Sequence, residues 1–119
     1  MAATTRTLLG PGDNVVCERC VVAESFFTRL RGLLGRSELP RDEGILIVPC
    51  SSVHTWFMRF PIDVVFLDRD LRVVGVAADV RPWRMRWRRG GKRVLELAAG
   101  EAAARGIEVG HRLRLEGTS

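Results

Sequence analysis

Residues 50–70 read CSSVHTWFMRFPIDVVFLDRD and form the most apolar part of the chain. Pro61 restricts the residue before it to extended or turn geometry, and the run IDVVFL that follows is typical of a buried strand. The stretch therefore predicts two central strands, one on each side of the proline. A cysteine, a histidine and an aspartate lie among these apolar residues, where polar groups need hydrogen-bond partners.

Further strands are expected on both sides of this centre. Runs rich in branched apolar residues occur at residues 14–23, 45–48, 52–58, 62–67, 71–80, 93–97 and 112–116. The runs at 62–67 and 71–80 flank a short polar turn, Asp68-Arg69-Asp70, and predict a β-hairpin.

Two segments have helical periodicity instead. In residues 24–36, apolar side chains recur at the spacing of one helical stripe, at Phe26, Phe27, Leu30, Leu33 and Leu34. Residues 98–105 (AAGEAAAR) predict a short second helix that ends at Gly106. Six or seven short strands with two helices predict a β-rich α+β fold, a small partly closed β-barrel.

The totals fit one globular domain. The chain has 119 residues, of which 46% are hydrophobic and 28% are charged, and a chain of this length buries a core without disulfides. Residues 1–13 are polar and contain Gly-Pro-Gly. We therefore expect a flexible N-terminal arm at 1–13 and a single domain at 14–119.

The chain shows no targeting signal. The N-terminal residues lack the apolar run of a signal peptide, and no stretch of about 18 apolar residues is present. We expect a cytoplasmic protein without a transmembrane segment. The three cysteines are an odd number, which argues against a disulfide framework.

Four segments, taken in order, resemble one known family. They are RLRGLLGR at 29–36, GILIVPCSSVHTWFMRFPIDVVFLD at 44–68, RVVGVAADVRPWR at 72–84 and VLELAAGEAAARGIEVGHRL at 94–113. Together they resemble the domain-of-unknown-function family 192, a set of small bacterial and archaeal proteins. The family's motif residues are present here as His54, Thr55, Phe57, Met58, Pro61, Ile62, Asp63, Leu95, Glu96 and Gly100.

The chain departs from the family near its end, where the usual Gly-Asp is replaced by Gly110-His111. Any role of that aspartate would be lost here. The resemblance implies a small β-rich, barrel-like domain and no established enzyme activity.

The first set of candidate ligand-binding residues is polar and belongs to the predicted strands: Cys50, His54, Thr55, Asp63 and Glu96. Residues two apart in a strand share a face, so Cys50 and His54 can point together if the segment between them is extended. A thiol, an imidazole and a carboxylate brought together could line a ligand pocket, bind a metal or perform Cys-His nucleophilic chemistry. Alternatively, His54 and Asp63 hydrogen-bond the backbone around Pro61 and have an architectural role.

Cys17 and Cys20 have the C-x-x-C spacing of zinc and redox sites. In a regular strand these positions lie on opposite faces, so the two thiols would not reach one ion. A redox C-x-x-C usually opens a helix, whereas these flanks are strand-like. We therefore expect packing thiols, and we predict no metal site and no cofactor.

Residues 81–93 (RPWRMRWRRGGKR) contain seven basic residues and no acidic residue, in a chain of net charge +5. They lack a periodic apolar face, which predicts a loop at 81–92. The candidate anion-binding residues are Arg81, Trp83, Arg84, Arg86, Trp87, Arg88, Arg89, Lys92 and Arg93. Arginines could bind phosphates while indole rings stack on bases. The segment also suits an acidic partner or an anionic membrane surface, or it covers the barrel end with arginines packed on tryptophans.

The sequence thus predicts a non-catalytic binding or accessory domain for an anionic ligand or partner. A polar pocket near His54 and Asp63 would be rimmed by the basic segment at 81–93. Two alternatives stay open: a nucleic-acid-binding domain that uses this segment, and a small enzyme that uses Cys50, His54 and Asp63. Common nucleotide-binding and hydrolase motifs, such as G-x-x-x-x-G-K-[ST] and G-x-S-x-G, are absent.

Overall fold

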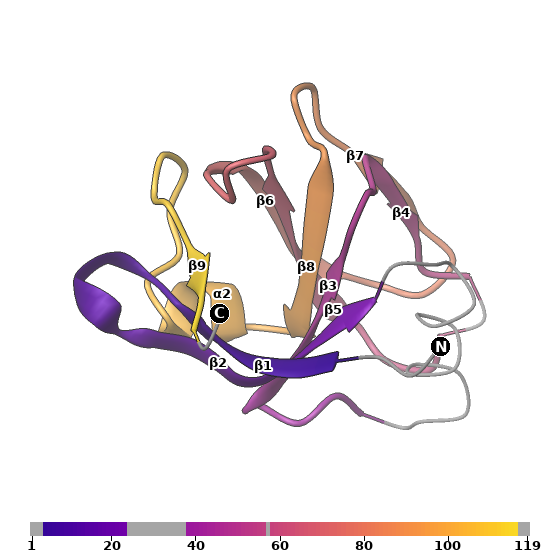
Figure 1. Cartoon of the computed structure of the whole chain (residues 1–119). Coiled ribbons are helices and arrows are strands. Elements are labelled where there is room, and N and C mark those ends of the chain that lie inside the picture. Colours follow the sequence, from indigo (N-terminus) through magenta and orange to yellow (C-terminus); the bar gives the residue numbers. More distant parts are fainter. Residues whose placement is uncertain (1–3, 24–37, 57, 117–119) are drawn as a thin grey trace.

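The computed structural model describes residues 4–23, 38–56 and 58–116 (Figure 1). In chain order, the elements of these residues are β1 (Thr4–Leu9), the 3-10 helix η1 (Pro11–Asp13), β2 (Val15–Ala23), β3 (Glu43–Ile47), β4 (Ser52–His54), β5 (Ile62–Leu67), β6 (Val73–Val80), β7 (Met85–Trp87), β8 (Arg93–Ala98), the α-helix α2 (Glu101–Ala104) and β9 (Arg114–Leu115). No helix in these ranges has the length and apolar character needed to cross a membrane.

Seven strands form one sheet in the order β6-β5-β8-β3-β2-β1-β9. Neighbouring strands are antiparallel except for β2 and β3, which are parallel. A parallel pair requires a long crossover, and residues 24–42 provide it. The strands β4 and β7 form a separate two-stranded antiparallel sheet, which lies beside the large sheet in Figure 1.

The fold is β-rich, but the predicted partly closed barrel is not confirmed. The large sheet is open, with β6 and β9 as its edge strands. Backbone hydrogen bonds of 2.8 and 2.9 Å join Gly110 to Val73 and Leu113 to Leu71, yet only one isolated bridge, between Arg72 and Arg112, has the geometry of strand pairing. The two edges therefore approach each other without a continuous ladder.

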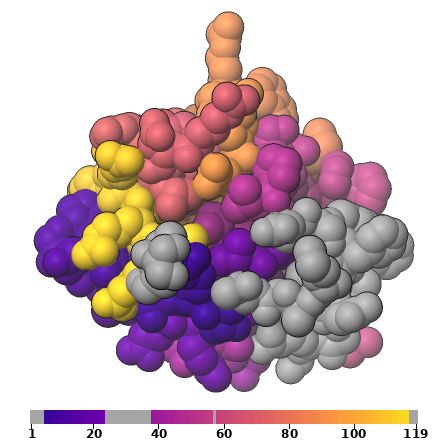
Figure 2. Space-filling model, in the orientation of Figure 1, coloured from indigo at the N-terminus to yellow at the C-terminus, as the bar shows by residue number. Residues whose placement is uncertain are grey.

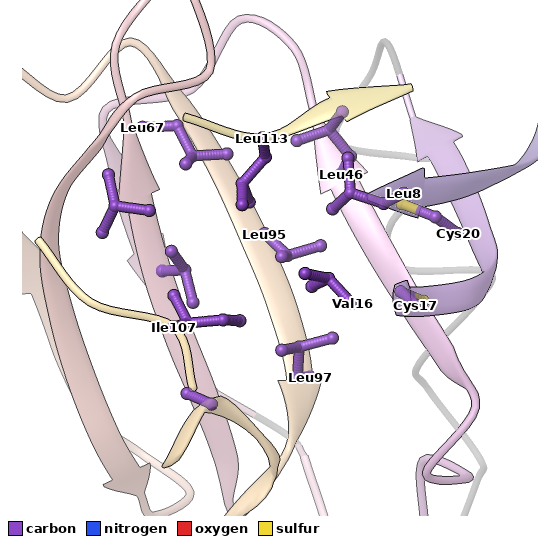
Figure 3. Close-up of a cluster of buried hydrophobic side chains, with 13 residues drawn as sticks. Leu8, Val16, Cys17, Cys20, Leu46, Leu67, Leu95, Leu97, Ile107 and Leu113 are labelled. Atoms are coloured by element: carbon purple, nitrogen blue, oxygen red, sulfur yellow. The ribbon is translucent and has the colours of Figure 1, made fainter. Parts of the chain in front are cut away.

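The centre of the sheet is buried on both faces. All six residues of β5 and the four central residues of β8 are buried, which explains the unbroken apolar run IDVVFL. On one face, a cluster next to α2 includes Leu8, Leu46, Leu95 and Leu97 (Figure 3). On the other face, a second cluster includes Ile45, Val64, Phe66 and Val94. The core is thus two apolar layers separated by one sheet.

The expectation of a flexible arm at 1–13 is wrong for Thr4–Leu9. This segment is β1, which pairs with β2 on one side and with β9 on the other. The indigo strand β1 and the yellow strand β9 accordingly lie side by side in Figure 1, and the indigo and yellow surfaces adjoin in Figure 2. Leu8 and Leu9 are buried, so a short apolar pair within polar surroundings is enough to hold this strand in place.

The predicted loop at 81–92 is also wrong in part, because Met85–Trp87 is β7. All three residues of this strand are exposed, so no apolar alternation marks it in the sequence. The extended segment expected at 52–58 is an ordered strand only at Ser52–His54, which pairs with β7.

The β5–β6 hairpin is confirmed, and its turn depends on Asp68. The Asp68 carboxylate accepts backbone hydrogen bonds from Asp70 at 2.8 Å and from Arg72 at 2.9 Å. The bond from the Arg72 N–H holds the pKa of Asp68 below its usual value.

Of the two expected helices, the second is present as the shorter α2, and the first, at 24–36, lies outside the described residues.

Gly44 offers a test of the packing between β3 and its neighbours. A Cβ there would lie 2.9 Å from both the Cys17 sulfur and a Leu97 methyl carbon, and 3.2 Å from the Glu96 carbonyl oxygen. We predict that Gly44→Ala lowers the free energy of unfolding by about 1–3 kcal/mol, measured by urea denaturation, because a packed core must shift.

Gly75→Ala is the matched control. The three atoms nearest to its Cβ would all belong to the Arg88 side chain, whose exposed end can move aside, so we expect a change within about 0.5 kcal/mol. Equal losses in both variants would show that the two sites are packed alike.

Candidate functional site

The carboxylate of Asp63 accepts hydrogen bonds from backbone N–H groups. It is 1% exposed, and its Oδ1 accepts a hydrogen bond from the Asp79 N–H at 2.8 Å. Its Oδ2 accepts from Gly100 at 3.0 Å and from Ala102 at 2.9 Å. These bonds connect β5 to the end of β6 and to the first turn of α2.

Two irregularities of the backbone make these N–H groups available. The β5–β6 register shifts between Ile62 and Val64, which pair with Val80 and Ala77, so β6 carries an extra residue opposite Asp63. Such a bulge leaves an N–H without a ladder partner, and the first turn of a helix does the same. The structure therefore gives Asp63 the architectural role that was one of the two alternatives.

Glu96 is fully buried in β8, but it does not approach Asp63. The register pairs Asp63 with Leu97 and Val64 with Glu96. Because alternate residues of a strand point to opposite faces, the two carboxylates project from opposite sides of the sheet. The two carboxylates therefore do not share one site.

Thr55 links the family motif to the basic segment. Its hydroxyl, which is fully buried, donates to the Arg81 carbonyl oxygen at 2.6 Å and accepts from the Arg84 N–H at 2.8 Å. Its backbone N–H donates to the Arg84 carbonyl oxygen at 2.8 Å, and the Trp83 N–H donates to the Thr55 carbonyl oxygen at 3.0 Å. Thr55 therefore fixes the start of the basic segment in one conformation.

His54 and Cys50 are half-buried; His54 ends β4, and Cys50 packs against the core cluster that includes Val64 of the large sheet. His54 pairs with Met85 in the β4–β7 sheet, and its ring centroid lies 4.7 Å from that of Trp56. The Cys50 thiol donates to the Ser52 carbonyl oxygen at 3.0 Å. Direct ligand contact by these two side chains stays a prediction.

The basic surface, defined as residues 81–93, is almost wholly open to solvent. Trp83, Met85 and Trp87 are 58%, 51% and 66% exposed, and neighbouring Trp56 is 50% exposed. Six of its seven basic side chains are exposed, and Arg93 is half-buried. Within the residues that the structure describes, none of the seven forms an ion pair. This surface therefore presents unneutralised positive charge beside three indole rings.

The two cysteines of the C-x-x-C share one buried face, contrary to the expectation for a regular strand. The ladder pairs Arg6 with Cys20 and Leu8 with Cys17, so β2 contains an extra residue, a bulge that realigns the side chains. Both cysteines are fully buried and belong to the apolar cluster drawn in Figure 3, while Glu18 and Arg19 between them are exposed.

The Cys17 thiol donates to the Asp42 carbonyl oxygen at 3.5 Å, and the pKa values of the two neighbouring thiols shift in opposite directions. A hydrogen bond from the Cys20 thiol lowers the pKa of Cys17, against the effect of burial. The same bond, together with burial, raises the pKa of Cys20. Cys17 is thus the first of the two to ionise. In the ranges 4–23, 38–56 and 58–116, no group of three His, Cys, Asp or Glu side chains is placed to hold a metal ion.

Comparison with known sequences identifies the family of this chain. Residues 9–115 match the family described as Uncharacterized ACR, COG1430, or DUF192. The chain belongs to this family. A UPF0127 protein of Pyrococcus furiosus is 37% identical over 97 residues, which cover 76% of this chain and 81% of the relative. A UPF0127 protein of Pyrococcus horikoshii is 39% identical over 69 residues, which cover 54% of this chain and 57% of the relative.

The fold of this DUF192 member is shared with a solved structure. A protein of unknown function from Novosphingobium aromaticivorans has a TM-score of 0.77 and 27% identity, over 94% of this chain and 84% of that protein. The predicted family membership is confirmed, and these relatives indicate no specific activity.

At Gly110-His111, where the resemblance leads us to expect Gly-Asp, this DUF192 member has a turn held by its backbone. Gly110 adopts a φ of 97°, which favours glycine, and its N–H donates to the Val73 carbonyl oxygen at 2.8 Å. The His111 Nε2 lies 3.5 Å from a Glu108 carboxylate oxygen. The departure from the family pattern therefore leaves the turn intact.

Asp63→Ala tests the architectural role of this carboxylate. Three N–H groups would lose their acceptor, so we predict a loss of about 3 kcal/mol or more in the free energy of unfolding, measured by urea denaturation. Asp63→Asn keeps one acceptor oxygen and should lose less. Asp79→Asn is the control, since only its backbone N–H takes part. If Asp63→Ala cost no more than this control, the role would be refuted.

The cysteine pair can be tested by titration in a Cys50→Ser background. Removing Cys20 by Cys20→Ala takes away the bond that lowers the pKa of Cys17 and leaves burial, which raises it. We therefore expect the Cys17 thiolate, followed by ultraviolet absorbance, to appear at higher pH in this variant. An unchanged midpoint would mean that the bond does not favour the Cys17 thiolate.

Proposed function

We propose that this DUF192 protein is a non-catalytic binding domain whose contact surface is the basic surface, residues 81–93, and whose partner is a polyanion. The observation that carries the proposal is β7, an ordered strand with all three residues exposed. A strand normally buries one face, and this one presents Met85, Arg86 and Trp87 to solvent.

The charge of this surface supports an anionic partner. Its seven basic residues face no acidic residue within the segment. Arginine and lysine side chains without local neutralisation create a positive potential that attracts anions and falls with ionic strength. Binding should therefore be electrostatic in part and sensitive to salt.

The surface is also held in place before any partner arrives. The pairs Ser52–Trp87, Val53–Arg86 and His54–Met85 join β7 to β4, and Thr55 fixes the preceding turn. A preorganised surface loses less conformational entropy on binding. In this proposal Cys50, His54 and Thr55 support the contact surface, and Asp63 and Glu96 serve the fold.

The second candidate function is binding of one particular polyanion, single-stranded nucleic acid. The exposed tryptophans favour this candidate. Trp83 and Trp87 are more than half exposed among arginines, and bases stack on such rings while guanidinium groups bind phosphates. An acidic protein segment would use the charges without the stacking. A small enzyme has less support, because the Asp63 oxygens are already occupied by three backbone donors.

The proposal predicts that a triple variant, Arg84→Gln, Arg86→Gln and Arg89→Gln, loses polyanion binding. Fluorescence anisotropy would follow titrations of a labelled oligothymidylate and of labelled polyglutamate over a range of salt. For the oligothymidylate, we expect affinity at low salt to fall about tenfold or more, and the slope of log K against log salt to become shallower by about 2.

The matched control carries the same change of net charge elsewhere, at exposed Arg19, Arg41 and Arg59. Equal losses in both triple variants, or no binding of either polyanion to the wild type, would contradict the proposal. Trp87→Ala separates the candidates, because it should weaken oligothymidylate binding alone if bases stack on that ring.

A further inference from the structure

A cavity of about 490 Å³ lies where the β5–β6 turn approaches β9, and Arg93 is the one residue it shares with the basic surface. It is formed by the β5–β6 turn, the start of β8 and β9, with their flanking residues. These three segments meet on the face shown in Figure 2. Its lining residues are Arg69, Asp70, Leu71, Arg93, Arg112, Leu113, Arg114 and Leu115.

The charge of this cavity is strongly positive. Four arginines and one aspartate are among its lining residues, which gives these residues a net charge of +3 by subtraction. Arg112 donates through Nε to the Asp70 carbonyl oxygen at 3.2 Å, and Arg114 pairs with the Asp13 carboxylate. Two of the arginines are therefore positioned by contacts with the protein.

The other two arginines have unused donors. Among the described residues, neither Arg69 nor Arg93 forms an ion pair or a side-chain hydrogen bond. A guanidinium group presents a planar set of N–H donors that matches the oxygens of a phosphate or carboxylate. The cavity thus holds two guanidinium groups without a partner among the described residues, beside two that are held by protein contacts.

The remaining lining is apolar. Leu113 is 1% exposed, and Leu71 and Leu115 are partly buried against the same core cluster. An apolar floor with a few converging polar groups is typical of a small-molecule site, and the volume falls within the usual range. A bare inorganic ion would use the arginines and leave the leucines uncovered.

From these observations we propose that the cavity binds a small organic phosphate, a phosphomonoester carried on an apolar body. The phosphate accepts hydrogen bonds from Arg69 and Arg93, and the apolar body lies on the partly buried Leu71 and Leu115. The arginines of the site come from three separate segments, at positions 69, 93 and 112–114, which is why only Arg93 was a candidate from sequence. The proposal does not depend on polyanion binding by the basic surface.

Calorimetric titration at low salt tests the site, with phenyl phosphate as the probe and inorganic phosphate and benzoate as comparisons. We expect phenyl phosphate to bind more tightly than either comparison. Arg69→Gln should raise its Kd about tenfold, since a hydrogen bond to a charged group is lost. Arg86→Gln, on the basic surface, and Arg59→Gln, on neither surface, should leave the Kd within twofold.

Each other result counts against the proposal. No binding of phenyl phosphate, or equal weakening by Arg69→Gln and the two control variants, would mean that no site exists. If inorganic phosphate bound as tightly as phenyl phosphate, the leucines would not contribute to ligand binding. If benzoate bound as tightly, the site would not prefer a phosphate group over a carboxylate. Thermal melts of each variant, with Tm unchanged, confirm that a loss of binding is not a loss of folding.

Discussion

The three hydrogen bonds accepted by Asp63 hold the architecture together. Its carboxylate is buried in the central strand β5 and binds N–H groups from the β6 bulge and from the start of α2. A buried carboxylate without such donors would be very costly, and the donors without it would be unsatisfied. One side chain therefore connects the hairpin, the helix and the sheet, and the Pro61–Asp63 part of the family motif is explained by folding.

Two β-bulges decide where the polar groups of the strands point. The bulge in β6 turns an N–H toward Asp63. The bulge in β2 places Cys17 and Cys20 on one buried face. Because side chains alternate along a regular strand, one extra residue reverses the assignment of faces for everything that follows. One β-bulge thus aligns the two thiols, and another supplies a backbone donor to the buried Asp63 carboxylate.

The arginines gather on two surfaces that follow from the topology. The β4–β7 pairing holds the basic surface in an ordered, exposed conformation. The arginine-lined cavity forms where the two edges of the large sheet approach each other. Arg93, at the start of β8, belongs to both. The two surfaces share a preference for anions, but only the cavity adds a floor of leucines and only the basic surface adds exposed tryptophans.

The family, the β-rich class, the β5–β6 hairpin and the concentration of charge at 81–93 could all be predicted from the sequence, because local patterns and motif order carry that information. The three-dimensional fold was needed to show that Asp63 and Glu96 point to opposite faces, that Thr4–Leu9 is a strand inside the sheet, and that β7 exists. Register, bulges and pairing between distant segments depend on long-range contacts. These contacts leave no periodic signal in a short exposed strand such as Met85–Trp87.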